Sequence, residues 1–212
     1  MVSRPPTASG HLVDGPADAP LTLLLAHGAG APMDSPFMER IAAGVAAAGL
    51  RVVRFEFPYM ARRRSEGRKA GPDRMPVLLD SFREAAATVE GPLAIGGKSM
   101  GGRVASRVAD ELGVRGLVCL GYPFHPPGRP EKTRTEHLAG LRTPTLVLQG
   151  ERDPFGRPDE VAAYDLSPAI TVEWLPDGDH SFKPRKRSGH TEEGNLDLAV
   201  SRIVAFLAAV AP

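Results

Sequence analysis

The chain has 212 residues, 24% of them charged and 42% hydrophobic, with a formal net charge of +1. This length suits one hydrophobic core, so we expect residues 1–212 to form a single domain, and the small net charge argues against a nucleic-acid partner. The first apolar run, residues 21–26, is too short for a membrane span and too deep for a signal peptide, so we predict a cytoplasmic protein without a membrane partner.

Short apolar runs typical of β-strands alternate with longer segments of helical periodicity. The expected strands are residues 21–27, 51–57, 92–97, 115–121, 144–150 and 170–176. Between them, apolar residues recur at helical spacing from Phe37, Leu78, Met100 and Leu196 onward. This alternation predicts an α/β fold with a mostly parallel central sheet and helices on both of its faces.

Long polar segments follow several of the expected strands, at residues 58–75, 122–143, 153–159 and 181–195. In an open parallel sheet such segments emerge at the carboxyl edge, where ligands bind, so we expect the functional site there. The segment 122–143 is too short and too rich in proline to form a separate lid domain. We therefore expect a site that is open to solvent.

The stretch "AIGGKSMGGRV" allows two interpretations, a phosphate-binding loop or a G-x-S-x-G nucleophile elbow. A phosphate loop needs a glycine where the chain has Pro92, and it would turn the only strand-like residues before Gly96 into loop. The elbow interpretation places Ser99 on a tight turn between a strand and a helix. Gly97 and Gly101 flank this serine because a Cβ at either position would collide across the turn.

A nucleophilic serine needs a base, and the base needs an acid that orients it, in the chain order Ser, Asp or Glu, His for this kind of elbow. Asp153 follows the strand 144–150, and His180 follows the strand 170–176, so both match this order. We predict Ser99, Asp153 and His180 as the catalytic residues. The alternatives are Asp177 or Asp179 as the acid and His125 or His190 as the base.

Two backbone amides are expected to form an oxyanion hole for the negative oxygen of the tetrahedral intermediate. One is the amide of Met100, which follows the nucleophile, and the other is the amide of Ala29 in "AHGAGAP". We interpret the neighbouring His27 as a hydrogen-bonding residue that fixes this loop. The chain has one cysteine, Cys119, so a cysteine-clustered metal site is excluded, and the chemistry requires no cofactor.

Two basic runs lie in the polar segments, with Arg62, Arg63, Arg64, Arg68 and Lys69 in one and Lys183, Arg185, Lys186 and Arg187 in the other. We expect both runs to converge near Ser99, where their positive field would favour an anionic acyl substrate. Arg63 and Lys186 are the candidate substrate-binding residues. The alternative is that both runs are solvated surface.

With these residues assembled, the chain resembles the α/β-hydrolase superfamily and, within it, the dienelactone-hydrolase-like branch. It is also similar to small predicted hydrolases grouped with testis-expressed protein 30 and the non-specific-lethal complex subunit 3. The segments that carry the resemblance are "LLLAHGAGAPMDSPFM", "RVVRFEFPYM", "GGKSMGGRVAS", "LVLQGERDPFG" and "GDHSF". The resemblance implies an α/β-hydrolase fold with Ser99, Asp153 and His180 in the triad positions.

Dienelactone hydrolases carry a cysteine where this chain has Ser99, so dienelactone itself is not the expected substrate. The combined expectation is a serine hydrolase that cleaves a small soluble ester through an acyl-enzyme on Ser99, without metal or organic cofactor. The alternative is a catalytically silent binding or scaffold domain with the same fold.

Overall fold

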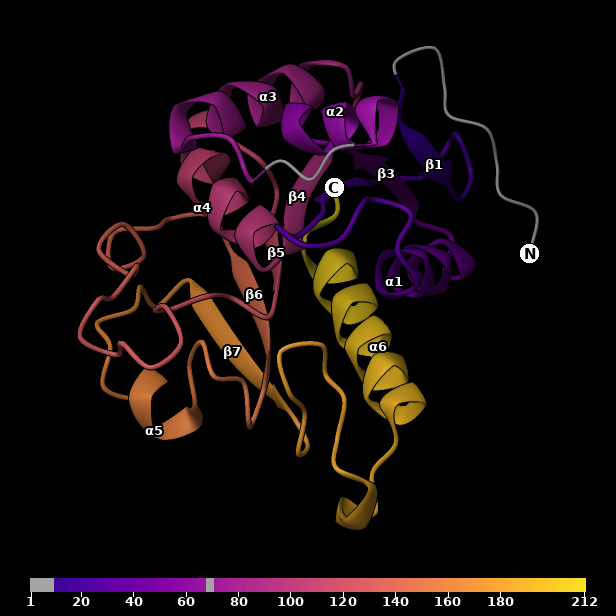
Figure 1. The fold of residues 1–212 in the computed structure, drawn as a ribbon. Coiled ribbons are helices and arrows are strands. Elements are labelled where there is room, and N and C mark those ends of the chain that lie inside the picture. The colour runs from indigo at the N-terminus through magenta and orange to yellow at the C-terminus, as the bar shows by residue number, and fades with distance from the viewer. Residues whose placement is uncertain (1–9, 68–70) are drawn as a thin grey trace.

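The computed structural model describes residues 10–67 and 71–212, and its strands form one seven-stranded sheet in the order β1-β3-β2-β4-β5-β6-β7 (Figure 1). The short β1 runs antiparallel to β3, and all other neighbours are parallel. All six strands expected from the sequence are present. The strands are β1 (Leu12–Asp14), β2 (Thr22–Ala26), β3 (Arg51–Phe55), β4 (Leu93–Lys98), β5 (Leu117–Leu120), β6 (Thr145–Gly150) and β7 (Ile170–Leu175).

Helices cover both faces of this sheet, which confirms the predicted α/β class with a mostly parallel sheet. The helix pair α1 and α6 lies on one face, and the pair α3 and α4 lies on the other (Figure 1). The helices are α1 (Pro36–Ala47), α2 (Pro58–Glu66), α3 (Met75–Ala87), α4 (Met100–Leu112), α5 (Pro158–Val161) and α6 (Glu192–Val210), with a 3₁₀ turn, η1 (Lys186–Ser188). Within the described ranges no helix is both long and apolar enough to cross a bilayer.

The central strands are apolar on both faces because each face carries its own layer of helices. Along β2, Leu23 and Leu25 pack into the core beneath α1 and α6. Leu24 and Ala26 point the opposite way, into the core beneath α3 and α4. This alternation is the two-residue period of a strand, here with apolar residues in both phases.

Four elements of the structure were not predicted, namely β1, α2, α5 and η1. The edge strand β1 has only three residues, too few to show a period, and an ion pair of 2.8 Å between Asp14 and Arg54 links it to β3. Helix α2 lies in the segment predicted as polar loop. It begins with Pro58 at its first turn and ends at Gly67 with φ of 65°. Both are ordinary helix end signals, but α2 buries too few residues to show an apolar stripe.

The segment 122–143 between β5 and β6 contains no helix or strand, so the expected absence of a lid domain is confirmed. This segment runs along α4. The hydroxyl of Tyr122 donates to the carbonyl of Arg134 at 3.1 Å, and the backbone amide of Thr143 donates to the Asp110 carboxylate at 2.8 Å. The carboxyl edge of the sheet near α4 is therefore bordered by a packed loop rather than by an inserted domain.

Cys119 lies in the middle of β5, directly beneath α4. Its thiol is buried and approaches the carbonyl of Gly102 at 3.6 Å, and burial raises the pKa of this thiol. The residue therefore behaves as a small apolar side chain, because thiol reactivity requires the thiolate form and access to solvent.

Candidate active site

Ser99 sits on a strained turn between β4 and α4, with φ of 51° and ψ of −112°. The turn closes only because its flanking residues lack side chains. A Cβ on Gly97 would lie 2.4 Å from the carbonyl carbon of Gly101, and a Cβ on Gly101 would lie 2.6 Å from the carbonyl oxygens of Ala26 and His27. The strand, turn and helix have the arrangement that a nucleophile elbow requires.

The Ser99 hydroxyl meets two further side chains at the carboxyl edge of the sheet. Ser99 Oγ lies 2.8 Å from His180 Nε2, and His180 Nδ1 lies 2.7 Å from Asp153 Oδ2. Because an ionised carboxylate can only accept, the proton belongs on Nδ1, and Nε2 is free to accept the serine proton. The structure thus brings together the three residues predicted as nucleophile, base and acid, in the geometry of a proton relay.

The carboxylate of Asp153 is completely buried, and hydrogen-bond donors compensate its charge. Its Oδ1 accepts from the backbone amide of Phe155 at 2.9 Å, and its Oδ2 accepts from Gln149 Nε2 at 2.9 Å. Gln149 also accepts from the backbone amide of Tyr122 at 2.7 Å, so it connects the ends of β5 and β6. Sequence reasoning missed Gln149, although a polar residue near the end of an otherwise buried strand was a signal.

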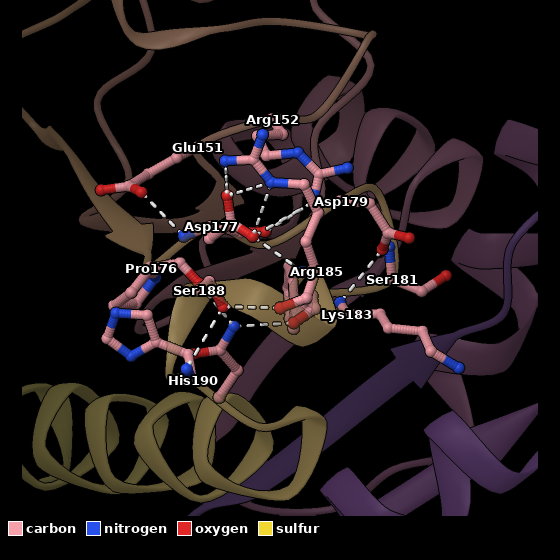
Figure 2. A network of polar contacts seen from close by, with 12 residues as sticks. Glu151, Arg152, Pro176, Asp177, Asp179, Ser181, Lys183, Arg185, Ser188 and His190 are labelled. Carbon is pink, nitrogen blue, oxygen red and sulfur yellow. Dashed lines mark hydrogen bonds and ion pairs between the residues drawn. The ribbon is translucent and has the colours of Figure 1, made fainter.

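The two aspartates considered as alternative acids hold the turn that carries His180, as Figure 2 shows. Asp177 binds the backbone and guanidinium of Arg185, which lowers the pKa of this carboxyl to about 2. Asp179 accepts from the backbone amides of Ser181 and Lys183, at 2.8 and 3.0 Å. Both aspartates therefore have acceptor roles away from the His180 imidazole.

The alternative bases also lie outside the relay. His125 is buried, with Nδ1 at 2.9 Å from the carbonyl of Pro126 and Nε2 at 3.2 Å from Glu160. His190 is exposed on the turn before α6, where its backbone amide donates to Ser188 Oγ. His180 is the histidine that the structure places against Ser99.

The loop after β2 approaches the nucleophile closely, since a Cβ on Gly28 would lie 3.7 Å from the Cβ of Ser99. The carbonyl of Gly28 accepts hydrogen bonds from His27 Nδ1 at 2.7 Å and from the Tyr59 hydroxyl at 3.2 Å. In a trans peptide the carbonyl and the following amide point in opposite directions. The amide of Ala29 is therefore directed away from the Tyr59 hydroxyl, and its part in an oxyanion hole stays a prediction.

His27 fixes this loop, as predicted. The backbone amide of Phe57 donates to His27 Nε2 at 3.1 Å, so the ring proton lies on Nδ1 and can be donated to Gly28. Burial lowers the pKa of His27, and this stabilises the neutral form that such a pair of bonds needs. The second predicted donor, Met100, is the first residue of α4, where the amide has no partner within the helix.

Tyr59 is a further site residue that the sequence did not reveal, because it lies on the unpredicted α2. Its hydroxyl shares one proton between the carbonyls of Gly28 and Ala29, at 3.2 and 3.1 Å, and the guanidinium of Arg63 lies 5.4 Å from the centre of its ring. Burial raises the pKa of Tyr59 to about 12. The hydroxyl thus remains a neutral donor throughout the ordinary pH range.

The two basic runs do not converge, which corrects the expectation from the sequence. Figure 1 shows α2, which carries Arg63, at the opposite end of the molecule from the 3₁₀ turn that carries Lys186. Acids within nearby segments neutralise at least four of the seven cations that the structure describes, and Arg68 and Lys69 lie outside the described residues. The ion pairs are Arg62–Asp73, Arg64–Asp34, Arg64–Glu56, Lys183–Glu192 and Arg185–Asp177.

The physical reason is that surface cations pair with the acids that folding brings beside them. Asp177 pairs with one run beside the β7 turn, and Asp73 and Glu56 neutralise cations of the other. Of the two candidate substrate-binding residues, Arg63 lies beside Tyr59 and the loop after β2, while Lys186 is exposed in η1. Among the described residues, no cluster of three or more His, Cys, Asp or Glu side chains could hold a metal ion.

A serine, histidine and aspartate relay at the carboxyl edge of a mostly parallel sheet, with the serine on a strained elbow, is the arrangement found in serine hydrolases of the α/β-hydrolase class. The sequence comparison agrees. Residues 19–208 match the alpha/beta hydrolase domain family, and the chain belongs to this family. The superfamily predicted from the sequence is confirmed.

Solved structures with the same fold include a lidless α/β serine hydrolase from Xanthomonas campestris, 23% identical over 95% of this chain and 89% of that chain, with a TM-score of 0.65. A dienelactone hydrolase from Anabaena variabilis is 21% identical over 95% and 92%, with a TM-score of 0.73. A serine hydrolase homologue from Coxiella burnetii is 18% identical over 93% and 90%, with a TM-score of 0.71. At these identities the similarity establishes the fold.

Proposed function

We propose that this protein is a serine hydrolase that cleaves a small soluble carboxylic ester through an acyl-enzyme on Ser99. The observation that carries the proposal is the continuous relay from Ser99 Oγ through His180 to the buried Asp153, with distances of 2.8 and 2.7 Å. A scaffold domain has no need of a strained serine, a histidine with a defined tautomer and a buried carboxylate in one line.

The reaction follows from these positions. As Ser99 Oγ bonds to the carbonyl carbon of the ester, its proton passes to His180 Nε2, and Asp153 stabilises the resulting imidazolium. The amides of Ala29 and Met100 hold the carbonyl oxygen as it becomes negative, each contributing about 3 kcal/mol to lowering the barrier. His180 then returns the proton to the leaving alcohol. Water, activated by the same imidazole, cleaves the acyl-enzyme and frees Ser99.

The absence of a lid between β5 and β6 supports small esters over large lipids, because this segment adds no element that could enclose a long chain. The structural relatives, which include a lidless serine hydrolase and a dienelactone hydrolase, support the same class of chemistry. Esters are therefore proposed ahead of thioesters and peptides. It remains a prediction that the chain is related to the testis-expressed protein 30 group. A cytoplasmic location is also a prediction.

An anionic acyl group remains part of the proposal, now supported by Arg63 alone. The Arg63 guanidinium lies over the Tyr59 ring, whose hydroxyl contacts the loop of the proposed oxyanion hole. The ratio of kcat/KM for carboxylate-bearing and neutral esters of equal size should exceed one at low salt and fall as salt rises. Replacing Arg63 with Glu should invert this ratio, whereas replacing Lys186 with Glu should leave it unchanged.

Labelling with a fluorophosphonate probe, together with hydrolysis of short p-nitrophenyl esters, tests the proposed function. The parent should be labelled, and Ser99→Ala should abolish labelling and reduce turnover by more than about a hundredfold without loss of folding. Ser201→Ala, which changes an exposed serine of α6, is the matched control and should behave like the parent. A folded parent that neither reacts with the probe nor hydrolyses any ester would instead be a binding or scaffold domain.

A further inference from the structure

Lys98, the last residue of β4, immediately precedes the nucleophile in the G-x-S-x-G motif. Only 9% of its surface is exposed, and its side chain enters the layer of side chains beneath α1 and α6. A buried lysine is uncommon because removing an ammonium group from water is costly unless polar partners compensate it. The mechanism described above assigns this residue no role.

The ammonium group of Lys98 contacts the residue proposed as the catalytic base. Lys98 Nζ donates a hydrogen bond of 2.6 Å to the main-chain carbonyl of His180. The same nitrogen lies 5.5 Å from the ring centre of Phe37 and 5.9 Å from that of Phe182. These distances are typical of cation–π interactions, which contribute further to stabilising a desolvated cation.

Gly121, which follows β5, shows how close the ammonium and the imidazole are. A Cβ built on this glycine would lie 2.8 Å from Lys98 Nζ and 3.2 Å from His180 Nδ1. Both groups therefore border the same small volume beside Gly121. Any residue larger than glycine there would displace one of them.

We propose that Lys98 is a positioning residue of the hydrolase site. Its protonated ammonium group links the main chain of His180 to β4, the strand that precedes Ser99, by a hydrogen bond. This bond keeps the imidazole aligned with the serine hydroxyl. This inference rests on the proposed hydrolase function. It adds a residue whose effect on the reaction passes entirely through His180.

The turn that carries His180 needs a hydrogen bond of this kind to hold its main chain in place. Two residues close to His180 in the chain, Asp177 and Phe182, have positive φ angles of 49° and 69°, which are strained for residues with side chains. Within the described ranges the bond from Lys98 is the only hydrogen bond to the main chain of His180. Small displacements of a reacting group are expensive, since about 1 Å can reduce a rate a hundredfold.

The charge of Lys98 is set by the groups around it. Burial lowers its pKa to about 8, and the carboxylates of Asp153 and Asp179 oppose this shift. The other groups that face the ammonium are the His180 carbonyl and imidazole, the uncharged rings of Phe37 and Phe182, and the backbone at Gly121. The ammonium group therefore loses its proton in mildly alkaline solution. A neutral amine donates a hydrogen bond roughly half as strong as a charged one.

The test is the pH dependence of kcat, KM and fluorophosphonate labelling between pH 6 and 10, for the parent, Lys98→Met and Lys98→Arg. In the parent, kcat and the labelling rate should fall about tenfold with a midpoint near pH 8, which corresponds to weakening one charge-assisted hydrogen bond. Lys98→Met should show a kcat at pH 7 about tenfold below the parent, nearly unchanged KM and no alkaline decline.

Lys98→Arg should recover part of the rate and keep it above pH 9, because a guanidinium stays protonated there. Lys132→Met, which removes an exposed lysine of the segment 122–143, is the matched control and should reproduce the parent. An alkaline decline in Lys98→Met identical to that of the parent, or an unchanged kcat, would overturn the proposal. A parent that is unlabelled at every pH would overturn the hydrolase function itself, so the two failures are distinct.

A second readout does not depend on catalysis. Because the pKa of Lys98 is lower in the folded state than in the unfolded chain, the folded state binds fewer protons between about pH 8 and 10.5. The urea midpoint of the parent should therefore rise relative to that of Lys98→Met across this range. A constant difference between the two midpoints would contradict the lowered pKa of Lys98 and, with it, the alkaline decline expected for the parent.

Discussion

The turns that carry Ser99 and His180 are built by different means, although their side chains meet at 2.8 Å. Close contacts between backbones shape the Ser99 turn, with Gly97 and Gly101 admitting neighbouring main-chain atoms where a Cβ would not fit. Charged side chains hold the His180 turn. Asp177 forms an ion pair with Arg185, and Lys98 donates a hydrogen bond to the carbonyl of His180. Backbone packing therefore fixes the Ser99 turn, whereas ion pairs and charge-assisted hydrogen bonds fix the His180 turn.

The two residues proposed to react, Ser99 and His180, should therefore respond to different perturbations. Backbone packing does not titrate and is not screened by salt, so the serine should keep its place across a wide range of solution conditions. Ion pairs and charge-assisted hydrogen bonds weaken with salt and when either partner changes its protonation state. Conditions that disturb the site without unfolding it should therefore act first on the base.

The largest effect is expected at Asp153, which neither turn contains but which orients the base. Asp153→Asn should lower kcat by about a thousandfold to ten-thousandfold, because an amide favours the wrong imidazole tautomer and cannot stabilise the imidazolium. Steady-state kinetics on Asp153→Asn and Asp179→Asn checks this. Asp179 accepts only backbone amides, so its variant should lose less than about tenfold, the cost of one weakened hydrogen bond. If Asp179→Asn were the more damaging change, Asp153 would not be the acid.

Adding one methyl group to the Ser99 turn should disrupt its backbone packing. In Gly101→Ala the new Cβ would lie 2.6 Å from two carbonyl oxygens, so the start of α4 must move and carry Ser99 with it. We expect at least a hundredfold loss of kcat, from a displacement of about 1 Å at the nucleophile. Gly140→Ala adds the same methyl where no atom lies within 4 Å and should keep parental activity. Equal activity in both variants would mean that the turn tolerates a side chain.

A smaller effect is expected beside the Ser99 turn, at the peptide that supplies the Ala29 amide. Tyr59→Phe removes the hydroxyl whose proton is shared by the carbonyls of Gly28 and Ala29. We expect kcat to fall about tenfold with little change in KM, since the peptide then orients less well toward the oxyanion. Tyr164→Phe is the control, because the buried Tyr164 hydroxyl has no partner within the described residues. A fall in kcat shared by both variants would point to general packing rather than to the oxyanion hole.

The smallest effect, and the one most sensitive to conditions, is expected at Asp177. Because its folded pKa of about 2 lies below the ordinary value of 3.8, its stabilisation is present above pH 4 and is lost as pH falls toward 2. Asp177→Asn should therefore lower Tm by a few degrees at pH 6, and the gap to the parent should narrow on acidification and in high salt. Asp165→Asn, at an exposed residue of the α5–β7 connection, is the control. A gap that persists unchanged at pH 3 would contradict the electrostatic account.

The Ser99 turn was the easier of the two to predict because its signals are local. A strand-like run, two glycines around a serine and an amphipathic helix all lie within about twenty residues, and chain order then selected Asp153 and His180. The hydrogen bond from Lys98 to the carbonyl of His180 could not be predicted from the sequence. It joins residues 82 positions apart and depends on the conformation of one side chain. For the same reason the ion pair between Arg64 and Asp34 was not predicted. It neutralises part of a basic run whose charge was expected to attract an anionic substrate.

The unpaired thiol beneath α4 makes this chain a convenient host for site-specific labelling. Since the Cys119 sulfur is buried and its pKa is raised, maleimide reagents should leave the native protein unmodified under conditions that alkylate a surface cysteine. A cysteine introduced at the exposed Val77 of α3 would then be the sole attachment point for a fluorophore or spin label. Spectroscopy could follow the α3 and α4 layer during turnover without first deleting a native residue.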